Sequence, residues 1–224
     1  MAKRQRAETD EAIVVVGLNR FGGQVADTLT RLGHEVLAID DNPATVQRWS
    51  RRLTYVVQAD ATDEGALRQI GVADFDRVVV AMGSSVETSV LTVLALAEVG
   101  VRQIWARATS DMHAKILSAV GAHHVIFPEA AMGERVAHLV ISKLLDFIAF
   151  EDDFAIAKTR TPPDLVGRRL VETDLPGRYG ITVVGVKGPN EAFEFVSPQT
   201  VVPPGGVLIV AGSDAQVRRF AATT

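Results

Sequence analysis

The run over residues 13–23 constrains the fold of this chain more than any other stretch. Four β-branched apolar residues, 13–16, lead into a glycine-punctuated segment, and an amphipathic segment follows over 24–32. This pattern predicts a buried strand, a tight turn and a helix. Such a turn gathers backbone N–H groups and the positive end of a helix dipole at one point. It therefore favours the binding of a phosphate or pyrophosphate.

The turn departs from the usual dinucleotide fingerprint G-x-G-x-x-G at one position. Gly17 and Gly22 occupy the first and third glycine positions, and Asn19 occupies the second. The second glycine normally lets a pyrophosphate approach the backbone, and the asparagine side chain crowds that place. Arg20 adds a cation that can reach terminal phosphate oxygens. The sequence therefore predicts a nucleotide phosphate site and leaves a dinucleotide open.

Composition excludes several classes of protein. The 224 residues carry a formal net charge of -4, which argues against a nucleic-acid partner. The chain has no cysteine, so disulfides, thiolate catalysis and Cys-ligated metal sites are excluded. We expect residues 1–11 to form a disordered tail, because they are mostly polar and contain no apolar core. A cytoplasmic location fits the lack of cysteine. The apolar runs are far shorter than the roughly 20 residues needed to cross a bilayer.

Strands and helices are expected to alternate between residues 35 and 127. Short β-branched runs alternate there with segments of helical period, and turn residues separate them. This arrangement predicts an α/β fold with a Rossmann-like, doubly wound parallel sheet and helices on both faces. The expected strands are 35–39, 54–58, 77–81, 103–106 and 124–127, and the expected helices are 44–51, 64–70, 86–99 and 112–120.

Polar residues follow the second and third strands at the edge where the glycine turn lies. Asp40 stands where a Rossmann site places the acceptor for a ribose hydroxyl, about 20 residues beyond the turn. A helix cap is the alternative there, and we assign the ribose to Asp40 and the cap to Asp41 or Asn42. After the third strand, a contact of Asp60 with a base edge and a helix cap by Thr62 or Asp63 both remain open.

Two further loops at this edge carry candidate ligand-binding residues. Gly83 and Ser84 follow the fourth strand, where a small residue lets a ligand approach and a hydroxyl can bond ribose or phosphate. Arg107 ends the fifth strand and is expected to point toward the ligand crevice. The adjacent His123 and His124 point to opposite sides of a strand, so we do not expect them to share a metal.

The second half of the chain follows a different pattern. Residues 130–150 are predicted to form one long helix with a broad apolar side, which needs a partner surface such as a second chain. Prolines and short β-branched runs then predict a small α+β domain. We expect a Rossmann-like domain over 12–129, a crossover and dimerisation helix over 130–152 and a C-terminal domain over 153–224.

Taken together, these segments resemble a known family. The chain is similar to the RCK (regulator of K⁺ conductance) domains of KtrA/TrkA-type subunits of bacterial potassium uptake systems. The likeness covers nearly everything after the tail, and the linked set of segments is more specific than the glycine turn alone. In the Rossmann-like part, the likeness rests on GLNRFGG (17–23), GHEVLAID (33–40), ADAT (59–62), AMGS (81–84), WARA (105–108) and FPE (127–129). In the C-terminal part, it rests on GRRL (167–170), YGITVV (179–184) and VLIVAG (207–212).

The resemblance implies a regulatory subunit that is not an enzyme. Such subunits are cytosolic and form homodimers that assemble into a ring, commonly octameric, beneath a membrane K⁺-translocating partner of the KtrB or TrkH kind. ATP, ADP or NAD(H) in the Rossmann crevice is the implied regulatory ligand. Glu129 matches an acidic position that can bind a divalent cation between subunits. The small domain of KtrA-like members can bind cyclic di-AMP.

The resemblance also implies roles for residues of the crevice. It places the turn against the phosphates, Asp40 at the ribose, the third loop at the adenine and two further residues at other ligand groups. The turn residues are Gly17, Asn19, Arg20, Phe21 and Gly22; the third loop supplies Asp60, Ala61 and Thr62; the further residues are Ser84 and Arg107.

An NAD-dependent oxidoreductase is the rival interpretation. It requires a catalytic acid or base beside the nicotinamide and a domain that holds the second substrate. The chain has two tyrosines, Tyr55 and Tyr179, and neither begins a Tyr-x-x-x-Lys motif. A nucleotide-sensing transcription factor is less favoured, because we find no basic recognition helix.

Overall fold

A computed structural model describes residues 12–83 and 85–224 and divides the chain into two compact units. The first unit ends at Pro128, and the second runs from Glu129 to Thr224. The predicted tail over 1–11 and the candidate residue Ser84 lie outside the described residues.

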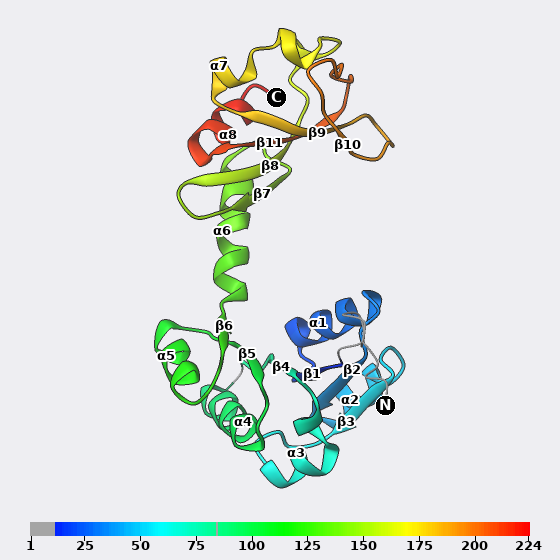
Figure 1. The fold of residues 1–224 in the computed structure, drawn as a ribbon, viewed down its shortest axis with the longest axis vertical. Helices are drawn as coiled ribbons and strands as arrows, with labels where there is room; N and C mark the ends of the chain where they lie inside the picture. Colours follow the sequence, from blue (N-terminus) through cyan, green and yellow to red (C-terminus); the bar gives the residue numbers. More distant parts are fainter. Residues whose placement is uncertain (1–11, 84) are drawn as a thin grey trace, which may run out of the picture. The chain divides into compact units, whose positions relative to one another are not determined.

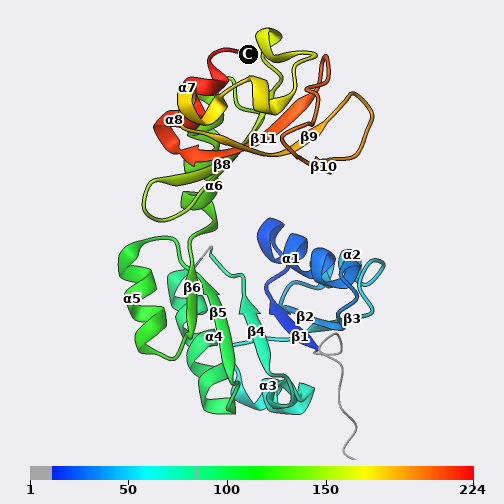
Figure 2. The same cartoon turned by 45° about the horizontal axis from the view of Figure 1, so that its top comes forward.

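The first unit is a six-stranded parallel sheet with helices on both faces, as Figures 1 and 2 show. The strand order is β3-β2-β1-β4-β5-β6, and every neighbouring pair is parallel. The predicted doubly wound fold is therefore confirmed. Its elements are β1 (Ile13–Val16), α1 (Arg20–Arg31), β2 (Val36–Asp40), α2 (Pro43–Trp49), β3 (Tyr55–Gln58), α3 (Glu64–Ile70), the 3-10 turn η1 (Val72–Asp74), β4 (Arg77–Val80), α4 (Val86–Val99), β5 (Gln103–Arg107), α5 (Asp111–Ala119) and β6 (His124–Ile126).

Alternation along β1 separates two apolar cores, one on each face of this sheet. Val14 and Val16 join a cluster with residues of α3, α4 and α5, whereas Val15 joins a cluster with residues of α1 and α2. A strand buried on both sides has to be apolar at every position, because successive side chains point to opposite faces. This explains the unbroken β-branched run with which the fold begins.

The strand order reverses between β1 and β4, which are neighbours in the sheet although β2 and β3 separate them in the chain. In open α/β sheets, ligands bind outside the carboxyl ends of the strands at such a reversal. The residues that follow β1, β2, β3 and β4 lie at this edge.

The second unit is built on a five-stranded antiparallel sheet in the order β10-β9-β11-β8-β7. Its core includes Phe147 of β7, Leu208 of β11 and Phe220 of α8. The predicted α+β character of this part is confirmed. Its elements are α6 (Pro128–Ile141), whose first residue closes the first unit, β7 (Asp146–Ala149), β8 (Phe154–Arg160), the 3-10 turns η2 (Pro163–Leu165) and η3 (Leu170–Glu172), α7 (Leu175–Tyr179), β9 (Thr182–Lys187), β10 (Glu194–Phe195), β11 (Val207–Ser213) and α8 (Asp214–Ala221).

The prediction of one helix over 130–150 is wrong in its second half. α6 ends at Ile141, where the Ser142 hydroxyl donates to the His138 carbonyl and accepts from the Leu144 amide. The next residues form β7, in which Phe147 is 2% exposed and Ile148 is 51% exposed. This alternation belongs to a strand. The helical interpretation failed because Leu144, Phe147 and Ile148 are also spaced three and four residues apart, which fits a helix equally well.

None of the helices among the described residues is both long and apolar enough to span a bilayer.

Candidate functional site

Two glycines shape the turn between β1 and α1. Gly17 has a φ of +88°, which L side chains rarely adopt. A Cβ on Gly22 would lie 1.9 Å from the Gly17 carbonyl oxygen and 2.7 Å from the Ala81 Cβ. The turn can therefore close against the end of β4 only with glycine at both positions.

Asn19 caps α1 with its side chain. Its Oδ1 accepts hydrogen bonds from the Phe21 amide at 2.9 Å and from the Gly22 amide at 3.0 Å. Its Nδ2 donates to the Ala81 carbonyl at 2.7 Å. The backbone of Asn19 is extended, as is usual for an N-cap residue. Arg20 is the first residue of α1, and its side chain is exposed.

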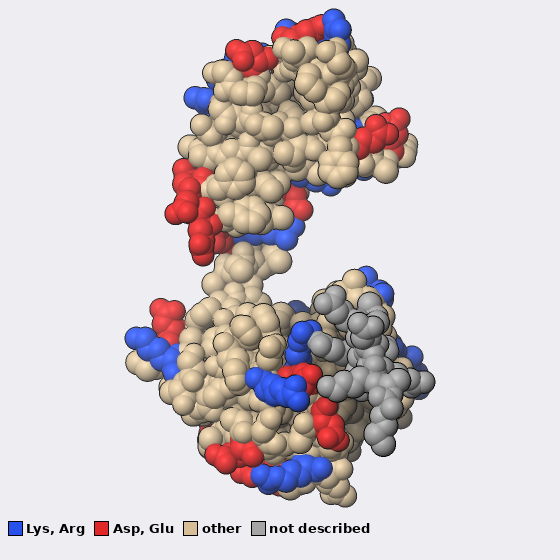
Figure 3. Space-filling view, viewed as in Figure 1, with Lys and Arg blue, Asp and Glu red and all other residues tan. Residues whose placement is uncertain are grey.

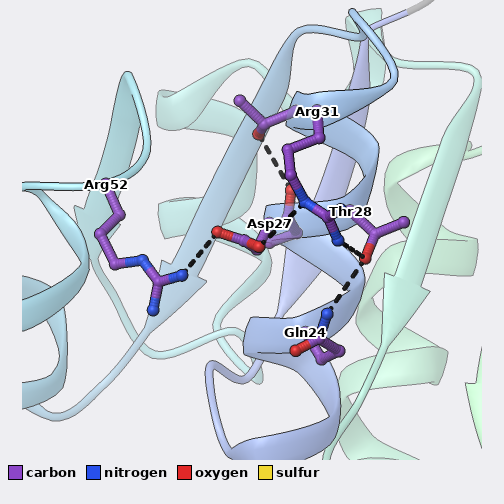
Figure 4. A network of polar contacts seen from close by, with 7 residues as sticks. Gln24, Asp27, Thr28, Arg31 and Arg52 are labelled. Atoms are coloured by element: carbon purple, nitrogen blue, oxygen red, sulfur yellow. Dashed lines mark hydrogen bonds and ion pairs between the residues drawn. The ribbon is translucent and has the colours of Figure 1, made fainter. Parts of the chain in front are cut away.

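The rest of α1 is fixed against the segment around α2. Asp27 accepts from Arg31 at 3.3 Å and from Arg52 at 2.8 Å, as Figure 4 shows. A Cβ on Gly23 would lie 2.2 Å from the Trp49 ring, so α1 approaches α2 closely at this point. The Asp27–Arg52 ion pair and the close approach at Gly23 thus join α1 to the segment around α2.

Asp40 joins β2 to the glycine turn. Its Oδ2 accepts from the Leu18 amide at 2.7 Å, and its Oδ1 accepts from the Asn42 amide at 3.0 Å. The Asn42 side chain in turn accepts from the amides of Ala44 and Thr45 and caps α2. The prediction of Asp41 or Asn42 as the helix cap is thus confirmed for Asn42. A carboxylate oxygen can accept more than one hydrogen bond, so Asp40 still has capacity for a ribose hydroxyl.

The loop after β3 is organised by Asp60 and Thr62. Asp60 Oδ1 accepts from the Thr62 hydroxyl at 2.7 Å and from the Thr62 amide at 2.9 Å. These two hydrogen bonds, the hydroxyl's first, lower the pKa of Asp60 below its ordinary value. Asp63 caps α3, accepting from the amides of Gly65 and Ala66. Of the two capping candidates, the structure therefore selects Asp63.

A small crevice opens between the ends of β1, β2, β3 and β4. The residues expected at a ligand that line it are Gly17, Asp40, Asp60 and Ala61. The sequence analysis missed Met82 and Thr88, which lie after β4 and at the start of α4. Both could have been predicted from the reversal of strand order beside β4, because ligands bind outside the carboxyl ends of the strands at such a reversal. The full lining is Val16, Gly17, Ile39, Asp40, Asp41, Ala59, Asp60, Ala61, Met82 and Thr88.

Arg107 ends β5 and lies across the loop after β4. A Cβ on Gly83 would lie 2.0 Å from an Arg107 guanidinium nitrogen, so the Arg107 side chain fits there only because residue 83 is a glycine.

His113 of α5 lies near Arg107; it is 1% exposed, and the sequence analysis did not single it out. His113 Nε2 lies 2.7 Å from the Ser89 hydroxyl, and its Nδ1 accepts from the Thr109 amide at 3.3 Å. Burial, and then the positive charge of Arg107, lower the pKa of His113 below its ordinary value.

Comparisons with known proteins show the family of the chain. The TrkA-N domain family model matches residues 13–128, and the TrkA-C domain model matches residues 156–223. The chain belongs to the KtrA/TrkA-type family of potassium uptake proteins. The family resemblance drawn from the sequence is thereby confirmed.

Individual relatives match this KtrA/TrkA-type chain over most of its length. It is 35% identical over 207 residues to Ktr system potassium uptake protein C of Bacillus subtilis (strain 168), covering 92% of this chain and 94% of that one. It is 31% identical over 212 residues to Ktr system potassium uptake protein A of the same organism, covering 94% and 96%. Among solved structures, it is similar to the GsuK channel bound to NAD, with 25% identity and a TM-score of 0.52. That match covers 97% of this chain and 39% of the channel chain, so this chain spans well under half of the channel's length.

Glu129 and the two adjacent histidines of this KtrA/TrkA-type chain are not among the residues that line the crevice. Glu129 is exposed in the first turn of α6, at the start of the second unit. Within the described ranges, no group of three or more His, Cys, Asp or Glu side chains is placed to hold a metal. His123 accepts from the Ile104 amide through Nδ1, while His124 stacks on Trp105. The two histidines thus have different partners.

Proposed function

We propose that this chain is the cytosolic, nucleotide-sensing regulatory subunit of a bacterial potassium uptake system, peripheral at the inner face of the cell membrane. The observation that carries the proposal is the glycine turn at the strand-order reversal, with Asp40 bonded to it, in a chain 35% identical to a Ktr uptake protein. On this proposal the chain is not an enzyme, and the crevice senses a ligand without transforming it.

ATP, ADP or NAD(H) is the ligand that this crevice suits. The amino-terminal end of α1, with Arg20 beside it, offers positive charge to phosphates, and its Phe21 and Gly22 amides, which donate to the Asn19 side chain, would be the hydrogen-bond donors. Asp40 offers an acceptor to a ribose hydroxyl. The similarity to the GsuK channel bound to NAD supports the dinucleotide. We assign Gly17, Asn19, Arg20, Phe21 and Gly22 to the phosphates, Asp40 to the ribose, Asp60, Ala61 and Thr62 to the adenine side, and Ser84 and Arg107 to further ligand groups.

A homodimer that builds a ring, commonly octameric, is the assembly we propose. The apolar side chains of α6 support it, because Met132, Val136, Val140 and Ile141 are all exposed, Val140 to 78%. An apolar surface of this kind usually marks an interface. The membrane partner on this proposal is an integral K⁺-translocating subunit of the KtrB or TrkH kind.

The surface charge does not suit a nucleic acid. On the face drawn in Figure 3, basic and acidic side chains of the first unit are interspersed. A phosphate backbone requires a predominantly basic surface. We therefore propose that the chain has no nucleic-acid partner.

Two further ligands follow from the family. Glu129, exposed in the first turn of α6, is the candidate for a divalent cation held between subunits. A groove of about 510 Å³ in the second unit is a candidate place for cyclic di-AMP. Leu170, Thr173, Leu175, Val183 and Pro198 are among the residues that line it.

A nucleotide can change such a ring only through different affinities for two ring states. An ATP γ-phosphate that contacts Arg20 supplies a group that ADP lacks. ATP and ADP would then favour different positions of α1, and the assembly would transmit this change of position to the membrane subunit.

Two measurements test the proposal together. Calorimetric titration with ATP, ADP, NADH and cyclic di-AMP should give binding of at least one of the first three nucleotides. Rb⁺ uptake into vesicles that hold the membrane subunit should then depend both on this chain and on that nucleotide. Reduction of NAD in the presence of a substrate, with no effect on Rb⁺ uptake, would instead identify an oxidoreductase.

A further inference from the structure

The side chain of Asn19 already occupies the hydrogen-bond donors that make the turn attractive to a phosphate. The first amides of a helix have no partner within the helix and point outward from its end. In α1, the amides of Phe21 and Gly22 both donate to the single oxygen Oδ1 of Asn19. An oxygen of a bound phosphate would need the same amides, so the side chain and the phosphate compete for one position.

The other end of this side chain holds the neighbouring strand. Asn19 Nδ2 donates to the carbonyl of Ala81, and Ala81 is the first residue after β4. The contact joins segments that are 62 residues apart in the chain. Ala81 precedes Met82 of the crevice and Gly83, across which Arg107 lies.

We propose that Asn19 is an internal competitor for the nucleotide phosphates: its amide group fills the phosphate position of the empty turn, and a nucleotide binds there only by displacing it. This inference rests on the proposed function, because it assumes that nucleotides bind at the turn. The displacement has two consequences. First, it lowers the affinity for the phosphates and leaves the affinity for the adenosine part unchanged. Second, it breaks the hydrogen bond from Asn19 to the Ala81 carbonyl, so phosphate binding changes the contacts of the loop after β4.

The helix-capping role can be separated from the competition by choosing substitutions at this one position. Glycine is nearly as good an N-cap as asparagine, and aspartate is equally good. The Asn19→Gly variant therefore keeps α1 while freeing the amides of Phe21 and Gly22. The Asn19→Asp variant keeps the cap and adds a negative charge at the phosphate position.

The experiment compares ATP and adenosine binding to the wild type and to both variants by calorimetry. We expect Asn19→Gly to bind ATP about tenfold more tightly, the factor that one or two net hydrogen bonds represent, with adenosine unchanged. Asn19→Asp, which cannot donate to the Ala81 carbonyl, should lose some thermal stability but remain folded, and it should bind ATP at least about tenfold more weakly. The Ser213→Gly variant, which removes the cap of α8 in the second unit, is the control and should bind ATP as the wild type does.

An independent readout follows the amides themselves. In ¹H–¹⁵N spectra of the wild type, the Phe21 and Gly22 amide signals should shift when ATP is added, together with the Asn19 side-chain NH₂ signals that report the loss of the Ala81 contact. Unchanged or weaker ATP binding by Asn19→Gly, in a protein whose wild type binds ATP, overturns the inference and leaves the proposed function intact. Absence of ATP, ADP and NADH binding to both wild type and Asn19→Gly overturns the proposed function itself.

Discussion

The carboxylate of Asp40 accepts a hydrogen bond from the backbone amide of Leu18 at 2.7 Å, across 22 residues of sequence. Leu18 lies inside the glycine turn and is 1% exposed, so its amide has no access to water. The acidic residue at the end of β2 is therefore a structural support of the turn. The proposed function would give the same side chain a second role, as the acceptor for a ribose hydroxyl.

The support role predicts the outcome of Asp40→Ala. Loss of the carboxylate leaves the buried Leu18 amide without a partner, which should lower the free energy of unfolding by about 1–3 kcal/mol. Urea denaturation measures this change. Asp41→Ala, at the adjacent exposed position, is the matched control and should change stability much less. Equal losses in the two variants would show that the Leu18 contact does not support the turn.

The tight approach of Gly22 to Gly17 predicts that Gly22→Ala is destabilising. The added methyl group would lie 1.9 Å from a backbone oxygen, which cannot move away as a flexible side chain can. We expect a loss of about 1–3 kcal/mol or more in the free energy of unfolding. At Gly133, within α6, nothing lies within 4 Å of an added Cβ. Gly133→Ala should therefore stabilise the protein by about 0.5–1 kcal/mol, and thermal denaturation of both variants should show shifts of opposite sign.

The exposed position of Arg20 at the start of α1 predicts a selective effect on phosphates. Arg20→Ala should weaken ATP binding about tenfold or more, because a hydrogen bond to a charged group is lost. Adenosine has no phosphate and should bind equally well to both proteins. Arg102→Ala is the control and should leave ATP binding unchanged. Arg102 precedes β5, at the opposite edge of the sheet, and pairs with Asp76. An equal loss for ATP and adenosine would contradict the role given to Arg20.

The buried His113 predicts a pH dependence of stability. Its Nδ1 accepts from the Thr109 amide, so a second ring proton on Nδ1 would break this hydrogen bond and place a charge in a buried site. Because burial and Arg107 lower its pKa in the folded protein, the unfolded chain binds the proton more readily. Stability is therefore fully present above the ordinary histidine pKa of about 6.5 and declines as the pH falls through that value.

Urea denaturation between about pH 5 and pH 8 tests this dependence, since the window brackets the ordinary histidine pKa. The wild type should lose stability toward pH 5, and His113→Gln, which carries no titrating ring, should show a flatter profile. The same substitution at the exposed His124 should keep the profile of the wild type. A His113→Gln profile as steep as that of the wild type would show that other groups cause the loss.

The sequence was most informative where local pattern and long-range packing impose the same requirement. Residues 13–16 must be apolar throughout because both faces of β1 are covered, and that requirement is visible in the sequence. Asp40 could be placed at the ligand edge because the carboxyl ends of parallel strands meet there. Ala61, which follows β3, and Arg107, which ends β5, could be placed at that edge for the same reason.

Other features depend on partners that lie far away in the chain. The sequence does not reveal that the Asn19 amide reaches the Ala81 carbonyl, since the contact exists only once β1 and β4 are neighbours. His113 was missed because its partner Ser89 belongs to a different helix. The end of α6 was misplaced because Phe147 and Ile148 fit a helix as well as a strand, and pairing with β8 decides between them.

The order of strands in the second unit bears on how the chain folds during synthesis. β11, formed by Val207–Ser213, pairs with both β8 and β9 and so lies in the middle of the sheet. The ribosome makes this strand after the other four strands of the sheet, and until then its two neighbours have no shared partner. The first unit can fold while translation continues, whereas the second must wait until β11 has emerged. A premature stop codon before residue 207 would thus remove the centre of that sheet and leave a nascent product with exposed strand edges.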